Sequence, residues 1–112
     1  MKHPKFEIFR GKDGQFYFRL TAPNGQPILA SEGYTAKASC KNGIQSVKTH
    51  AEQDDRYKRK ETSNEKFSFN LLSKNNQVIG TSQTYTSKQG LENGIQSVKD
   101  NAPGAGIEDT TA

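Results

Sequence analysis

One heptapeptide, Asn-Gly-Ile-Gln-Ser-Val-Lys, occurs twice in the chain, at residues 42–48 and again at residues 93–99. The similarity extends beyond it: when residues 16–51 are aligned with residues 67–102, 18 of the 36 positions are identical without a gap. The chain is therefore an internal duplication. Because a small unit with one helix cannot cover its own apolar face, we expect the two copies to pack against each other.

The first copy has the pattern of short strands joined by tight turns. Residues 6–10 form a candidate strand that ends in a Gly-Lys-Asp-Gly turn sequence. In residues 15–22, apolar and polar side chains alternate, which predicts a strand with one buried face and one exposed face. A Pro-Asn-Gly-Gln turn then precedes a third strand, expected over residues 27–32.

A helix is predicted after the third strand of each copy. Apolar residues recur at helical spacing over residues 36–51, with Thr35 as the expected N-cap, and the same stripe returns over residues 87–102. Gly43 lies on this stripe, although glycine inside a helix costs about 1 kcal/mol relative to alanine. We therefore expect the helix backbone to approach the sheet, or the other helix, closely at this glycine.

The connector between the copies is highly charged, and its sequence Arg-Tyr-Lys-Arg-Lys-Glu at residues 56–61 could be read as a basic patch for nucleic acid. The offset of the repeat favours another interpretation, because it aligns residues 57–61 with the first strand at residues 6–10. We expect a polar edge strand here, whose lysines discourage pairing with other chains. A flexible linker and a nucleic-acid patch remain the alternatives.

The pattern of strands and helices resembles the YegP-like proteins, a functionally uncharacterised family. The resemblance rests on the strand pattern of residues 6–20, the turn at residues 24–26, the Ser-Glu-Gly-Tyr junction at residues 31–34 and both heptapeptides. It covers nearly the whole chain. Two departures fall in the second copy, where the first strand is more polar and Thr84 replaces the glycine found at position 33.

The repeat and the resemblance together give the expected fold. Two copies related by an approximate twofold would join edge strands into one sheet and place both helices on the same side. The resemblance implies an α+β fold of two tandem β-β-β-α-β units that share one antiparallel sheet, with the C-terminal strand of each unit exchanged into the other. We expect a single domain over residues 1–112, with repeat one at about 5–55, repeat two at about 56–109 and a disordered tail at 110–112.

Composition limits the compartment and the kinds of partner. The net charge is +4, and it is uneven: residues 1–51 carry eight Lys or Arg against three Asp or Glu, whereas residues 52–112 carry eight against nine. Cys40 is the single cysteine, which excludes an intrachain disulfide and fits a reducing compartment. No run of residues is long and apolar enough for a membrane span. We expect a cytoplasmic protein without membrane contact.

The sequence contains no arrangement typical of an enzyme. Cys40 is the candidate nucleophile, but it lies on the apolar stripe of its helix and aligns with Leu91, so we interpret it as a core residue. With two histidines, one cysteine and no ligand-spaced cluster, neither a metal site nor a cofactor is expected. We expect no catalytic residue.

Two surfaces could bind a partner. The first is the outward side of the two helices, where polar residues repeat: Asn42, Gln45, Ser46, Lys48, Asn93, Gln96, Ser97 and Lys99. The second is the sheet face away from the helices, where aromatic, cationic and polar side chains could contact single-stranded nucleic acid: Phe9, Tyr17, Arg19 and Thr21. Contact between the two helices across the twofold, together with incomplete divergence, is the alternative explanation for the first surface, and strand propensity alone is the alternative for the second.

From the sequence, we expect a small non-enzymatic binding or accessory module whose ligand is not identified. The partner could be a protein, bound at the helix pair, or single-stranded nucleic acid, bound weakly at the sheet face. A metabolic enzyme is the third possibility. We expect a monomer, because the duplication already supplies the partner that a lone unit would need.

Overall fold

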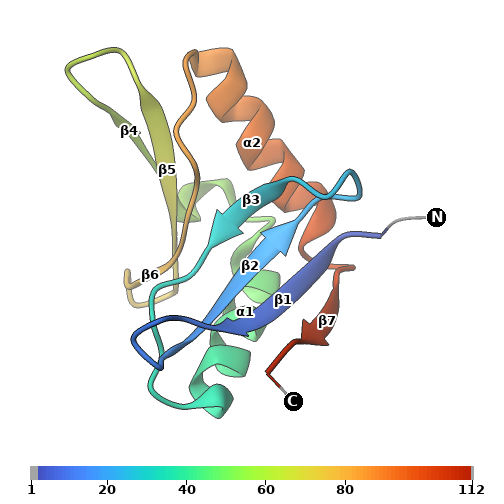
Figure 1. The fold of residues 1–112 in the computed structure, drawn as a ribbon. Helices are drawn as coiled ribbons and strands as arrows, with labels where there is room; N and C mark the ends of the chain where they lie inside the picture. Colours follow the sequence, from blue (N-terminus) through green and yellow to red (C-terminus); the bar gives the residue numbers. More distant parts are fainter. Residues whose placement is uncertain (1–2, 112) are drawn as a thin grey trace.

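The structure is a computed structural model that describes residues 3–111. Ten elements follow one another along the chain (Figure 1), and their bounds are: β1 Lys5–Arg10, β2 Phe16–Thr21, β3 Pro27–Ala30, α1 Lys37–His50, η1 Asp54–Arg56, β4 Tyr57–Glu61, β5 Phe67–Leu72, β6 Val78–Thr81, α2 Lys88–Asn101 and β7 Gly106–Asp109. The α+β fold of two tandem units is confirmed.

All the strands belong to one seven-stranded sheet in the order β4-β5-β6-β3-β2-β1-β7. The sheet is mixed rather than wholly antiparallel, because β7 pairs with β1 in parallel, Lys5 opposite Gly106 and Ile8 opposite Asp109. Helix α2 returns the chain to the end of the sheet at which β1 starts, so both strands run the same way. Figure 1 shows β7 beside β1, although they come from opposite ends of the chain.

The exchange of the last strand is thus seen in one direction. The strand that follows α2 joins the first repeat, as β7 beside β1. The strand that follows α1 is β4, which is itself the first strand of the second repeat and pairs with β5. Within residues 3–111 the sheet therefore has no eighth strand, and β4 forms its edge.

An internal twofold relates the two repeats. Ala30 of β3 pairs with Thr81 of β6, and these are the same position of the two copies, so the axis passes through this pair. On either side, β1–β2 and β4–β5 have the same register, with Phe6 opposite Leu20 and Tyr57 opposite Leu71. Equivalent bulges also interrupt the pairing of β2 with β3 and of β5 with β6.

The predicted alternation in the strands and the predicted stripes on the helices form the core. Both helices cover one face of the sheet, and each packs against strands of both repeats. The largest fully buried side chains come from these strands and helices: Phe6, Phe18, Phe69, Ile8, Leu20, Leu29, Ile44, Leu71, Ile95, Val47, Val98 and Cys40.

The glycine of the repeated heptapeptide makes room for a tyrosine. A Cβ atom at Gly43 would overlap the hydroxyl of Tyr34 and lie 3.0 Å from the Phe18 ring, and one at Gly94 would overlap the hydroxyl of Tyr85. Each tyrosine precedes its helix and lies between it and the sheet. The close approach that we expected at Gly43 is therefore to an aromatic side chain, not to the backbone of the sheet or of the other helix.

The two helices begin differently. Helix α2 has Ser87 as its N-cap, whose hydroxyl accepts a hydrogen bond of 2.9 Å from the Gly90 amide. Helix α1 has Ala36 at the same position and no side-chain cap, so the prediction of Thr35 as N-cap is wrong. The alignment explains the error: Thr35 and its counterpart Thr86 are identical in the two copies, but each lies one residue before the N-cap.

At the twofold axis, the two repeats differ in volume. Leu29 is fully buried, and its counterpart Gly80 leaves the space that the leucine fills: a Cβ at Gly80 would lie 2.6 Å from Leu29 Cδ2. Two leucines would collide at this point, and two glycines would leave a hole. This contact between the two repeats, here called the seam, is therefore complementary in side-chain volume, although the surrounding fold is symmetric.

The connector contains the strand β4, as the offset of the repeat predicted, preceded by the short helix η1. At the other end, Thr110 and Thr111 were expected in a disordered tail. The amide and the hydroxyl of Thr110 donate hydrogen bonds to the Ile8 carbonyl, at 3.0 and 2.7 Å; Ala112 lies outside the described residues. None of the described helices is long and apolar enough to cross a membrane.

Candidate functional site

The outward side of the helix pair carries the repeated polar residues. Four of them are exposed, two on each helix: Asn42, Gln45, Asn93 and Gln96. The two serines are half-buried and contact their own helix, since Ser97 Oγ accepts from Asn101 Nδ2 at 3.1 Å and Ser46 Oγ lies 3.4 Å from His50 Nδ1. Each helix packs more extensively on the strands than on its twin. Binding at this surface stays a prediction.

The two lysines of the heptapeptide hold the chain together across the twofold. Lys48 Nζ donates a hydrogen bond of 2.7 Å to the Ala105 carbonyl, and Lys99 Nζ donates one of 2.8 Å to Asp54 Oδ1. Ala105 and Asp54 are equivalent residues, each in the segment that follows the opposite helix. These ammonium groups are therefore already engaged within the fold.

The predicted sheet-face residues form one cluster. The rings of Phe9 and Tyr17 stack with centroids 5.7 Å apart, and Arg19 Cζ lies 4.1 Å from the centre of the Phe9 ring. Arg19 Nε also lies 3.0 Å from Glu7 Oε1, and Tyr17 donates a 2.6 Å hydrogen bond to Asp13. Within this cluster, the aromatic rings therefore already stack on each other, and the arginine already has an aromatic ring and a carboxylate as partners.

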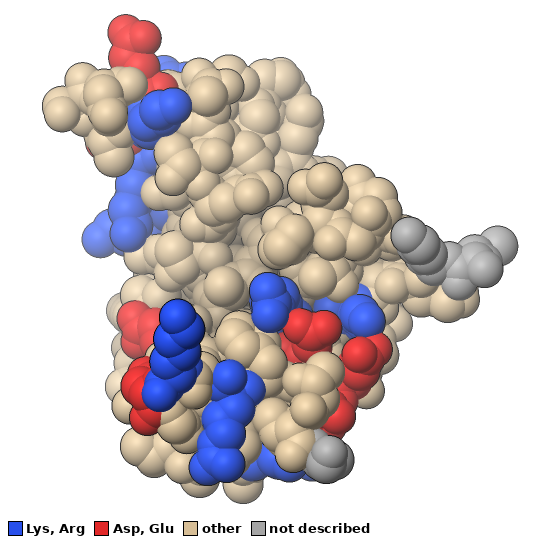
Figure 2. All heavy atoms as spheres, in the orientation of Figure 1, with Lys and Arg blue, Asp and Glu red and all other residues tan. Residues whose placement is uncertain are grey.

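Thr21, the remaining sheet-face candidate, is buried, and its hydroxyl lies 3.4 Å from the Lys5 carbonyl. One row of side chains crosses this face in register from β7 to β4: Glu108, Glu7, Arg19, Ala30, Thr81, Asn70 and Lys58. The row begins with two acidic residues and ends with a basic one. Figure 2 shows acidic and basic side chains next to each other over β1 and β7 and few charges in the middle of the visible face.

A third surface, absent from the sequence analysis, lies along the free edge of β4 and is here called the open edge. It comprises β4, the start of β5 and the first two turns of α2, and it encloses a cavity of about 310 Å³. Phe67 and Leu91, 9% and 4% exposed, form its apolar floor. Its charged walls are Arg59, Lys60, Glu61, Lys88 and Glu92.

The open edge corresponds to the place that β7 occupies in the first repeat. Two residues equivalent to its walls contact β7: Ile8 pairs with Asp109 of that strand, and Lys37 forms a 2.9 Å ion pair with the same aspartate. Lys88 is the counterpart of Lys37, yet within residues 3–111 it makes no ion pair. The position beside the first strand of a repeat is therefore occupied by β7 at β1, whereas no described strand occupies it at β4.

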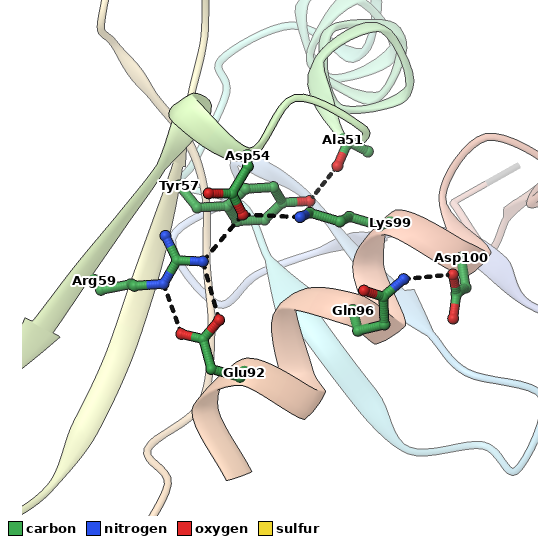
Figure 3. A network of polar contacts seen from close by, with 8 residues as sticks. All are labelled: Ala51, Asp54, Tyr57, Arg59, Glu92, Gln96, Lys99 and Asp100. Carbon is green, nitrogen blue, oxygen red and sulfur yellow. Dashed lines mark hydrogen bonds and ion pairs between the residues drawn. The ribbon is translucent and has the colours of Figure 1, made fainter. Parts of the chain in front are cut away.

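A network of polar contacts braces the base of the open edge (Figure 3). Arg59 Nε and Nη2 donate to the two oxygens of Glu92 at 2.6 and 3.1 Å, and Nη2 also lies 3.1 Å from Asp54 Oδ1, which Lys99 contacts as well. On the same strand, the Tyr57 hydroxyl donates a hydrogen bond of 2.6 Å to the Ala51 carbonyl. The network joins β4 to both helices and leaves Arg59 little capacity for a further anion.

Electrostatics in the network follow from these contacts. The Lys99 and Arg59 hydrogen bonds lower the pKa of the Asp54 carboxyl, and the Arg59 hydrogen bond lowers the pKa of the Glu92 carboxyl. The Glu92 hydrogen bond raises the pKa of the Arg59 guanidinium in turn. Asp54, Arg59 and Glu92 therefore neutralise one another within the network, and the exposed charges left for a ligand at the open edge are those of Lys58, Lys60, Lys88 and Glu61.

Groups suited to covalent chemistry are few. Cys40 is buried, and burial raises the pKa of its thiol to about 11, so the thiolate required of a nucleophile is scarce. In the described range, no three His, Cys, Asp or Glu side chains come close enough together to hold a metal ion. The arrangement is better suited to binding an extended chain at the open edge, which presents unpaired backbone groups beside lysines.

One feature of the sequence pointed to the open edge, namely the lysine-rich strand predicted at the edge of the sheet. The prediction of Lys58 and Lys60 on an edge strand is correct, but it was interpreted only as protection against pairing. The sequence analysis expected an exchanged strand in both units, and what it did not predict is that β4 lies at the edge of the sheet with no described strand beside it.

The comparisons with known proteins agree on a family. The family described as "Domain of unknown function (DUF1508)" matches the chain twice, at residues 12–57 and 63–109, which are the two repeats. The UPF0339 protein in the ptx operon 5′ region of Stutzerimonas stutzeri is 54% identical over 102 residues, 91% of this chain and 92% of that protein. UPF0339 protein YegP of Escherichia coli K12 is 47% identical over 106 residues, 95% and 96% of the two chains.

Two solved structures have the same fold. The solution NMR structure of YegP from E. coli, a protein of unknown function, gives a TM-score of 0.92 at 44% identity, over 98% of this chain and 95% of that one. The solution NMR structure of a UPF0339 protein from Shewanella oneidensis gives 0.90 at 42% identity, over 95% and 90%. The resemblance to YegP-like proteins inferred from the heptapeptides and strand pattern is thereby confirmed.

Proposed function

The chain belongs to the DUF1508 family, also called UPF0339 or YegP, whose function is unknown, and we propose that it is a non-enzymatic module that binds a protein segment along its open edge. One observation carries the proposal: strand β7 is bound on β1, whereas the equivalent edge of β4, which the internal twofold relates to it, has no strand among the described residues. Addition of an extended peptide to a free sheet edge is a recurrent mode of protein recognition.

The backbone of β4 is suited to such pairing. The Ile8 carbonyl points toward β7, where it accepts from the Thr110 amide. Arg59 is the counterpart of Ile8 in the same register with its neighbour strand, so its backbone groups, and those of Glu61 two residues later, point outward from the sheet. A segment laid along β4 would meet both a ladder of hydrogen-bonding groups and the apolar floor of the cavity.

Separate observations bear on the absence of catalysis, the cellular location, the oligomeric state and nucleic-acid binding. A non-enzymatic role is favoured by the buried thiol of Cys40, and a cytoplasmic location by the absence of a second cysteine. Pairing of two copies through β4 is disfavoured by the exposed lysines Lys58 and Lys60 along this edge, so we propose a monomer. Nucleic acid on the sheet face is less favoured, since Glu7 forms an ion pair with Arg19 there and Glu108 lies beside Glu7.

A titration of amide chemical shifts tests this proposal. We expect extended peptides of six residues, supplied as acidic, neutral and basic sequences, to shift amides of residues 57–61 and 88–92 with at least one of the three. Single-stranded RNA and DNA, added separately, should leave these amides unshifted. If no peptide shifts the open edge, or if nucleic acid alone shifts residues 9, 17 and 19, the proposal is wrong.

A proline variant identifies backbone pairing as the cause. Glu61→Pro removes an outward donor at the edge of the sheet, where a missing amide hydrogen is tolerated, and should weaken peptide binding severalfold. The matched control is Glu61→Ala, which removes the same carboxylate and keeps the donor. Equal loss in both variants would show that the side chain, not the ladder, binds the peptide.

A further inference from the structure

We propose that the segment bound at the open edge is acidic, with two adjacent carboxylate side chains, and that it adds to β4 in parallel, in the register that β7 takes on β1. This inference rests on the proposed function and specifies its ligand. The template is within the molecule: β7 has the sequence Gly-Ile-Glu-Asp and is followed by two threonines.

The register fixes which cations the two carboxylates would contact. On β1, Glu108 lies beside Glu7 and Asp109 lies beside Ile8. The counterparts of Glu7 and Ile8 on β4 are Lys58 and Arg59. Consecutive residues of a strand point to opposite faces of the sheet, so the two carboxylates would lie on opposite sides.

On the face away from the helices, β4 offers a better partner than β1 does. The glutamate at the Glu108 position would lie next to Lys58, whereas on β1 it lies next to the like-charged Glu7 and depends on Lys5, 2.7 Å away. The counterpart of Lys5 is Arg56, whose guanidinium is turned to the Ser73 carbonyl at 2.9 Å. The carboxylate on this face is thus assigned to Lys58.

On the helix side, the second carboxylate meets Lys88. Asp109 binds Lys37 from the first turn of α1, and Lys88 occupies the same position in the first turn of α2. Lys88 is exposed and has no acidic partner among the described residues. Arg59, on the same side, is occupied by Glu92 and Asp54, so Lys88 is the cation that the incoming carboxylate would neutralise.

The C-terminal strand of a second copy is a poorer occupant than a separate acidic segment. In each copy β7 is held on β1 by the Thr110 hydrogen bonds to Ile8 and by the Lys37–Asp109 and Lys5–Glu108 ion pairs. Its release would break those contacts to form equivalent ones. We therefore assign the open edge to a partner protein with an exposed acidic strand or tail.

Three peptides test the charge preference on the intact protein. The acidic probe has the sequence of residues 106–111, Gly-Ile-Glu-Asp-Thr-Thr; the neutral probe replaces Glu-Asp by Gln-Asn, and the basic probe replaces it by Lys-Lys. Two exposed ion pairs correspond to about twofold to thirtyfold tighter binding of the acidic probe than of the neutral one, and the preference should decline with added salt. Amide shifts should map to residues 57–61 and 88–92.

Charge reversal at the two lysines should reverse the preference. Lys88→Glu and Lys58→Glu should each weaken the acidic probe severalfold, and the double variant should bind the basic probe instead. Lys74→Glu is the matched control, because it makes the same charge change in the turn between β5 and β6, outside the open edge. It should leave the affinity within about twofold.

A spin label distinguishes the direction of the added strand. With the label at the amino end of the acidic probe, parallel addition should broaden the Tyr57 amide more than the Glu61 amide, and a label at the carboxyl end should do the opposite. Antiparallel broadening, or shifts confined to β1, would overturn the register. Equal affinity of all three probes at β4 would overturn the acid preference and leave the proposed function intact, whereas no shift at β4 with any probe would overturn both.

Discussion

The first strands of the two repeats occupy equivalent positions and have opposite character. Strand β1 lies between β2 and β7, and its inward side chains Phe6 and Ile8 are fully buried. Strand β4 lies at the edge, and its inward side chains are Tyr57, whose hydroxyl reaches a backbone carbonyl, and Arg59, which is held by carboxylates. A strand with neighbours on both sides can be apolar, whereas an edge strand in the same fold requires polar partners.

The largest effect is expected at the seam, where the repeats differ in volume. Leu29→Gly should lower the free energy of unfolding by about 3–5 kcal/mol, because it opens a cavity in the core. Gly80→Leu should lower it by about 1–3 kcal/mol or more, because the new side chain would collide with Leu29. Denaturant unfolding of each variant measures both values.

The double variant Leu29→Gly/Gly80→Leu makes the comparison sharper. It moves the leucine across the twofold, from the first repeat to the same position in the second, and should recover most of the stability lost in each single variant. If the two losses simply add, the seam is not interchangeable between the repeats.

A smaller effect is expected at the helix glycines, where the repeats are alike. Gly43→Ala and Gly94→Ala should each cost about 1–3 kcal/mol of unfolding free energy, since the methyl group would press on the hydroxyl of Tyr34 or Tyr85. Adding Tyr85→Phe should relieve part of the Gly94→Ala penalty, because it removes the atom closest to the new methyl group.

Gly104→Ala serves as the control for these variants, because a Cβ there would meet no atom within 4 Å. It should change the unfolding free energy by less than about 0.5 kcal/mol. A stabilising effect of alanine at Gly43 or Gly94, as helix propensity alone would give, would contradict the tyrosine contact.

The helix caps should produce an effect of about 1 kcal/mol that differs in sign between the repeats. Ser87→Ala removes the hydroxyl that binds the Gly90 amide and should cost about 1 kcal/mol. Ala36→Ser supplies the missing hydroxyl to α1 and should stabilise by up to that amount. Thermal unfolding of both variants provides the measurement, and a destabilising Ala36→Ser would show that α1 cannot adopt the α2 cap.

The smallest effect at neutral pH is expected from the charged network, which only the second repeat has. Asp54 and Glu92 have lowered pKa values in the folded protein, so their contribution is present above the unfolded values near pH 4 and is lost as pH falls through the folded ones. Arg59→Met should cost less than about 1 kcal/mol at pH 7 and should flatten the decline of stability between pH 5 and 3.

Lys41→Met is the control, since Lys41 is the first-repeat counterpart of Glu92 and is exposed without an ion pair among the described residues. Stability measured from pH 7 to pH 3 should then follow the unmodified protein. An Arg59→Met curve that runs parallel to the unmodified one would show that acid sensitivity arises elsewhere.

Most of the fold could be predicted because the repeat supplies each observation twice. The alternation of Phe18 with its polar neighbours and the stripe of Ile44 and Val47 specify which faces are buried, and the offset correctly turned residues 57–61 into a strand. The parallel direction of β7 could not be predicted, because period-two alternation is the same for both directions. The tyrosine beside Gly43 is a tertiary contact that helical spacing does not report.

The open edge could not be predicted for a different reason. An alignment of repeats implies that equivalent residues have equivalent surroundings, so it predicts the same partners for Lys88 as for Lys37. After α1 the chain passes through η1 into β4, the first strand of the second repeat, whereas α2 is followed by a separate strand, β7. This difference in connection leaves Lys88 without the carboxylate that Lys37 binds. The roles of the helix-pair and sheet-face residues stay predictions.

The pairing of β7 with β1 also has a consequence for how the protein is made. Gly106 is synthesised long after Lys5, so the outer side of β1 stays uncovered by β7 while the residues between the two strands are made. Contacts this distant in sequence form slowly, since a long loop must close first. We expect the nascent chain to complete this part of the sheet last, when β7 docks beside β1.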